Sequence, residues 1–78
     1  MDIRGEITMK TLYQLDIKLP EKGFTLYRIA IEKLLKPIED PWETLNNGFT
    51  LEISILTTPK TIDTLRYEIR RETGMEVE

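Results

Sequence analysis

The residue types on which most enzyme chemistry depends are missing from this chain. Its 78 residues contain no histidine and no cysteine, so the chain can supply no imidazole base, no thiolate nucleophile and no zinc cluster. Ser54 is the only serine, and no histidine is present to activate it in a hydrolase triad. We therefore expect no enzyme activity and no catalytic residue.

Three carboxylates, Glu39, Asp40 and Glu43, surround a Pro-Trp pair. Such groups can hold magnesium or calcium, or can act together as a general acid and base. Their spacing is not that of a calcium-binding loop, and no glycine tightens the segment. We interpret the segment as a polar connection and predict no metal site and no cofactor.

Two other groups of residues are candidates for binding. Lys22 and Gly23 precede a predicted helix, whose free N–H groups and dipole favour an anion. The alternative is that Gly23 only makes the turn into the helix. Arg66, Arg70 and Arg71 lie on a second predicted helix and suit phosphate or the acidic surface of a partner. The alternative for these arginines is a solvated helix face, because cations are favoured near a helix C-terminus.

The first predicted strand is unusually long. Apolar residues dominate alternate positions from Ile3 to Leu19, with one lapse in the polar set at Leu12, which indicates a strand with one face in water. Seventeen extended residues would span about 55 Å, more than a domain of this size can cover. We therefore expect some of Ile3, Ile7 and Met9 to extend past the core as an exposed strand edge that invites pairing. A second chain could pair along this edge and bind these residues, and the alternative is that the segment folds back as a hairpin and leaves the sheet open.

Two helices are predicted from spacing and from their end signals. An apolar stripe of helical period predicts a helix over residues 25–36, with Thr25 as its N-cap and Pro37 as its stop. The second helix is bounded by Thr58 as N-cap and by Gly74 as a left-handed cap.

The Asn47-Gly48 pair predicts a β-hairpin between the two helices. Both residues tolerate a positive φ, as the two loop positions of a type I′ turn require. The loop would join strands over residues 41–46 and 49–56, with the last residue of the first strand opposite the first residue of the second.

The order of elements is strand, helix, strand, strand, helix and a short final strand over Met75–Glu78. This is the βαββαβ order of the ferredoxin-like, split βαβ fold. We therefore predict the α+β class, as a two-layer sandwich with a four-stranded antiparallel sheet in the order 4-1-3-2. Both crossovers must be right-handed, which places the two helices on one face. The whole chain, residues 1–78, is expected to form a single domain.

The composition, with 40% hydrophobic and 32% charged residues, is that of a soluble globular domain. No apolar run is long enough for a membrane helix, and the N-terminus lacks a signal-peptide pattern. We therefore expect a cytoplasmic protein with no membrane partner. The formal net charge of −3 argues against nucleic acid as the main partner. Self-association or a protein partner is expected instead.

Two known families share this layout. The segment Leu15–Gly23, followed by a helix, resembles the ACT domains and related small ligand-binding modules. That resemblance implies regulatory ligand binding at a dimer interface near Lys22 and Gly23. The five elements up to Arg71 are also similar to those of the small accessory subunit of the archaeal tRNA-modifying KEOPS complex. The second helix of that family is longer and more apolar than Thr61–Arg71.

These observations lead to three hypotheses about function. The first is a small non-enzymatic interaction or assembly module, which is either dimeric or a subunit of a larger complex. The second is a regulatory, ACT-like domain that binds a small anionic metabolite. The third is an accessory subunit of an RNA-modifying complex.

Overall fold

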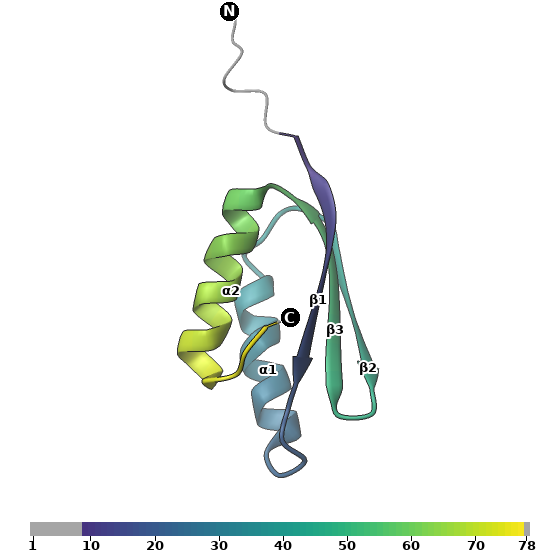
Figure 1. Ribbon diagram of the computed structural model, residues 1–78, viewed down its shortest axis with the longest axis vertical. Coiled ribbons are helices and arrows are strands. Elements are labelled where there is room, and N and C mark those ends of the chain that lie inside the picture. The colour runs from purple at the N-terminus through teal and green to yellow at the C-terminus, as the bar shows by residue number, and fades with distance from the viewer. Residues whose placement is uncertain (1–8, 78) are drawn as a thin grey trace, which may run out of the picture.

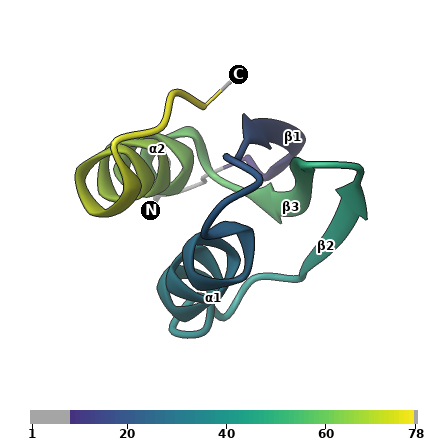
Figure 2. The ribbon, with the colours of Figure 1, turned by 90° about the horizontal axis from the view of Figure 1, so that it is seen from below.

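A computed structural model describes residues 9–77 of the chain. Its elements are strand β1 (Thr11–Lys18), helix α1 (Phe24–Leu35), strands β2 (Trp42–Asn47) and β3 (Thr50–Thr57), and helix α2 (Pro59–Thr73). The strands form an antiparallel sheet in the order β1-β3-β2, and both helices cover the same face of it (Figure 1 and Figure 2). The predicted α+β class is confirmed. No helix in this part of the chain has the length and apolar character needed to cross a membrane.

The sheet has three strands over residues 9–77, where the sequence predicted four. Met75–Val77 is not a strand. Gly74 turns the chain with a φ of +74°, and the Met75 N–H donates to Thr73 Oγ1 over 3.0 Å. Met75 and Val77 nevertheless pack against the core, so the alternation marks an apolar tail rather than a strand. The predicted ferredoxin-like order 4-1-3-2 is reduced to 1-3-2, and β1 becomes an edge strand.

The predicted hairpin forms between β2 and β3, but in a register shifted by two residues. Asn47 pairs with Thr50, which leaves Gly48 and Phe49 as the loop. Of these two loop residues, Gly48 alone has a positive φ, of +64°. This is the pattern of a type II′ turn rather than the predicted type I′ turn. Because the shift is even, every side chain keeps its face. Trp42 therefore packs toward the core.

Both helices form close to the predicted ranges. The caps of α2 are confirmed, since the Thr61 N–H donates to Thr58 Oγ1 over 3.3 Å and Gly74 adopts the left-handed conformation. The N-cap of α1 is Gly23, with a φ of +88°, so the prediction of Thr25 as the cap is wrong. The helix therefore begins at the residue after the turn rather than two residues later.

A single hydrophobic core lies between the sheet and the two helices. The strands contribute alternate residues to it, and each helix contributes one side. Leu26, an apolar residue in the first turn of α1, is exposed because the helix turns it away from the sheet. The buried apolar residues are Leu15, Ile17, Leu19, Ile31, Leu35, Leu51, Ile53, Ile55, Ile62, Leu65 and Ile69.

Candidate interaction site at the sheet edge

The backbone of β1 presents an unpaired edge. The Leu19 N–H donates to the Phe49 carbonyl over 2.9 Å, and antiparallel residues that exchange hydrogen bonds recur at every second position. The odd-numbered residues of β1 therefore direct their backbone groups to β3. The backbone N–H and C=O groups that point outward belong to Leu12, Gln14, Asp16 and Lys18. Across residues 9–77, no strand pairs with this edge.

Two carboxylates face each other beside this edge, on the sheet face that the helices leave uncovered. Asp16 lies directly opposite Glu52, and like charges in that position destabilise a sheet. Glu52 accepts a hydrogen bond from Asn47 Nδ2 over 3.2 Å. The buried Oδ1 of Asp16 has no hydrogen-bond partner among residues 9–77. Among residues 9–77, the edge thus holds a carboxylate for which no ion pair is formed.

An apolar pair lies further along the same face. Leu12 is directly opposite Leu56, and these side chains are 68% and 40% exposed. Together with Pro41 and Trp42 they line a shallow hollow of about 210 Å³. Leu12 is the residue that interrupts the polar set of β1, so the lapse in alternation marked this exposed site. The sequence predicted a fourth strand at this edge, and for that reason Leu12 was not expected to be a site residue.

The residues predicted as a partner-binding extension are only partly covered by the structure. Ile3 and Ile7 lie outside the described residues, so their role stays a prediction. Met9 lies two residues before the start of β1 and is 77% exposed. The edge of β1 follows Met9 along the chain. This edge is a better-defined interaction site, because its pairing with β3 anchors it to the core.

The predicted ligand site at Lys22 and Gly23 is a turn in this structure. Gly23 provides the positive φ that starts α1, and a Cβ at its position would lie 3.4 Å from the ring of Tyr27. The side chain of Lys22 is exposed. Within the described part of the chain, neither residue lines any of the four hollows found. Ligand binding at this turn stays a prediction.

Two of the three arginines of α2 lie near carboxylates. Arg70 Nε lies 3.6 Å from Glu76 Oε2, and Arg71 Nη2 lies 3.1 Å from Glu68 Oε1. Exposed pairs of this kind contribute about 0–1 kcal/mol. Arg66 and Arg70 share the lining of a hollow of about 200 Å³. The arrangement is that of a solvated helix face, and partner binding by these residues stays a prediction.

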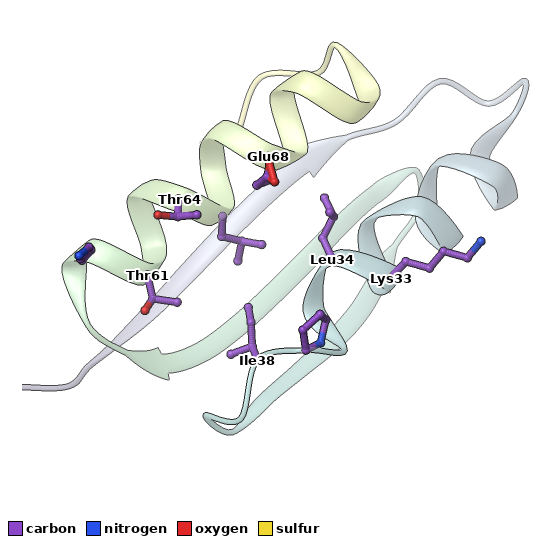
Figure 3. Close-up of a pocket in the computed structure, with 9 residues that line it drawn as sticks. Lys33, Leu34, Ile38, Thr61, Thr64 and Glu68 are labelled. Carbon is purple, nitrogen blue, oxygen red and sulfur yellow. The ribbon is translucent and has the colours of Figure 1, made fainter.

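A groove of about 400 Å³ lies between α1 and α2 (Figure 3). Leu34, Ile38 and Leu65 provide apolar lining, and Lys33 and Lys60 lie among the polar lining residues. No sequence pattern predicts this groove, because the groove depends on how the two helices pack.

The carboxylate of Asp40 has a structural role. Its Oδ1 lies 2.7 Å from Lys10 Nζ, and its Oδ2 accepts a hydrogen bond from the hydroxyl of Thr57. The hydrogen bond from Lys10, followed by that from Thr57, holds the pKa of Asp40 below its ordinary value. Asp40 thus joins the segment after α1 to the ends of β1 and β3. Glu39 lies in the same connecting segment, whereas Glu43 lies within β2.

We expect Asp40→Asn to reduce the dependence of stability on acid pH. The pKa of Asp40 is lower in the folded chain than in the unfolded chain, so its contribution is present above the unfolded value, about pH 4, and is lost as the pH falls through the folded value. Thermal unfolding midpoints measured from about pH 6 to about pH 2.5 should therefore fall less steeply for the variant. Parallel curves for the two proteins would contradict this role.

Comparisons with known proteins place this chain in no family. No family model, curated protein or solved structure matches it.

Proposed function

We propose that this protein is a small non-enzymatic assembly module that forms a homodimer by pairing β1 with β1 of a second copy. The observation that carries the proposal is the unpaired outer edge of β1, which runs for eight residues and is anchored to the core by β3. An exposed strand edge is a template for pairing with another chain. Antiparallel pairing of two identical edges gives a closed, two-fold interface.

The two edges of the sheet differ in ways that favour β1. β1 is the longer strand, and no proline interrupts it. β2, at the other edge, has six residues and starts directly after Pro41. The β1 edge also carries both signs of charge, since Lys18 lies two residues from Asp16. An edge with both signs can be complementary to itself.

The mass of the protein in solution tests the proposal. Light scattering at about 100 μM should give twice the chain mass of 9.2 kDa, with dissociation on dilution toward the micromolar range. A mass of 9.2 kDa at every concentration would overturn the homodimer.

The accessory-subunit hypothesis is the second candidate, and it rests on the order of elements. The structure has the order β1-α1-β2-β3-α2, which is the five-element layout of the KEOPS subunit that the sequence resembles. The ACT resemblance implies a further strand, which residues 9–77 do not form. A thermal-shift screen with metabolites separates the ACT-like regulatory domain from an assembly module. A metabolite at 100 times its Kd would stabilise an ACT-like domain by about 2.7 kcal/mol, whereas an assembly module should not respond.

A further inference from the structure

We infer that the two β1 strands pair in one register, with the two-fold axis at Tyr13. This inference rests on the proposed homodimer and adds the arrangement of the second copy. In this register Leu12 of one copy lies opposite Gln14 of the other, and Lys10 lies opposite Asp16. Each of these pairs occurs twice, because both copies contribute the same edge.

The phase of the backbone limits the registers that can form. The Leu19–Phe49 hydrogen bond shows that the odd-numbered residues of β1 bond to β3. The residues of β1 that direct their N–H and C=O groups outward are therefore even-numbered. A hydrogen-bonded antiparallel pair requires an outward residue on each strand. The symmetric registers therefore place even-numbered residues opposite even-numbered residues, and they differ in where the axis lies.

Charge disfavours several of these registers. An axis at Gln14 would set Lys10 opposite Lys18, and an axis at Asp16 would set two carboxylates opposite each other. Like charges directly opposite destabilise a pair of strands. An axis nearer the C-terminal end of β1 would bring Pro20 into the ladder, where it has no N–H to donate.

Two registers on either side of Tyr13 avoid like charges but lose complementary contacts. An axis at Leu15 would set Leu12 opposite Lys18, an apolar side chain against a charge. An axis at Leu12 would leave Asp16 without a cation opposite it. The axis at Tyr13 has neither defect.

The Tyr13 register supplies a cation opposite Asp16. Asp16 faces Glu52 and has an oxygen without a hydrogen-bond partner among residues 9–77. Lys10 of the second copy would lie opposite Asp16, beside this pair of carboxylates. Since Lys10 also binds Asp40 of its own chain at 2.7 Å, the contact extends an existing ion pair across the interface.

The same register joins the exposed apolar pairs of the two copies. With Leu12 opposite Gln14, the two Leu12 side chains become diagonal neighbours, about 7–8 Å apart at Cα. Each already lies opposite Leu56. The dimer would thus carry one apolar strip across the uncovered face of a six-stranded sheet, where each separate copy exposes a small patch.

Engineered cysteines test the register directly, because the chain contains none of its own. Leu12→Cys and Gln14→Cys place thiols at exposed positions of β1. In the Tyr13 register a Leu12→Cys chain faces a Gln14→Cys chain at a Cα separation of about 5.5 Å, within the range for a disulfide. Under mild oxidation the mixture should cross-link at least about tenfold faster than either variant alone.

The outcomes separate the register from the dimer itself. Faster cross-linking of Leu12→Cys alone, or of Gln14→Cys alone, would move the axis to that residue and overturn the register while the β1 dimer stands. A dimer of correct mass that cross-links in none of these mixtures would overturn the Tyr13 register. Light scattering on the reduced variants shows whether each still dimerises, and a monomeric wild-type protein would overturn the dimer and the register together.

Discussion

Gln14→Pro should convert the proposed dimer into a folded monomer. The Gln14 N–H points away from β3, so its loss breaks no hydrogen bond within the sheet, and the side chain is exposed. Proline would remove two intermolecular hydrogen bonds per dimer and place its ring against the second strand. At about 1 kcal/mol for each bond, plus the steric cost of the ring, we expect the dissociation constant to rise by at least about 100-fold.

The opposite edge of the sheet provides the matched control. The Leu56 N–H donates to the Pro41 carbonyl over 3.1 Å, so the odd-numbered residues of β2 direct their backbone groups to β3. The N–H of Asn46 therefore points outward. Asn46→Pro should therefore leave the dissociation constant unchanged. Sedimentation equilibrium measures both constants, and circular dichroism should show the helix content of the wild-type protein in both variants. Dissociation caused by Asn46→Pro, but not by Gln14→Pro, would assign the interface to β2.

Ile53→Ala should cost about 2–5 kcal/mol of unfolding free energy. Ile53 is fully buried in the central strand, between Leu15 on β1 and Thr44 on β2. Truncation would leave a cavity under both helices, which the rigid sheet can close only in part. A domain of this size has a total stability of about 4–12 kcal/mol, so the loss is a large fraction of the whole.

The measurement is made in the Gln14→Pro background, where dimerisation adds no concentration-dependent term. Urea unfolding gives the free energy of each variant. Leu45→Ala, at a 64% exposed position of the same sheet, is the matched control and should change stability by about 0.5 kcal/mol or less. Should Ile53→Ala fail to fold, Ile53→Val should still cost about 0.5–1.5 kcal/mol. Equal effects of Ile53→Val and Leu45→Ala would contradict the assignment of Ile53 to the core.

The sequence by itself determined those features that depend on near neighbours along the chain. The caps of α2 at Thr58 and Gly74 were predicted correctly, because a cap acts on backbone groups within one turn. The inward face of β1 and β3 was predicted from alternation, since side chains of a strand change face at every residue. The absence of histidine and cysteine likewise excluded whole classes of chemistry without any structure.

Only the tertiary structure decided which strands pair and which edge is left free. The Asn47-Gly48 pair predicted a hairpin, yet the register shifted by two residues, since both registers put the same side chains in the core. Met75–Val77 alternates like a strand, but the turn at Gly74 and the bond to Thr73 leave it beside the core, outside the ladder.

The candidate site depended on that outcome. Leu12 and Asp16 are ordinary residues of an alternating strand, and they become an interaction surface only because no fourth strand covers the β1 edge in the described chain. The partners of Asp40 were equally hidden, since Lys10 and Thr57 lie 30 and 17 residues away. Contacts at such separations are selected by the competition among all strands and helices for the same core, which no local pattern records.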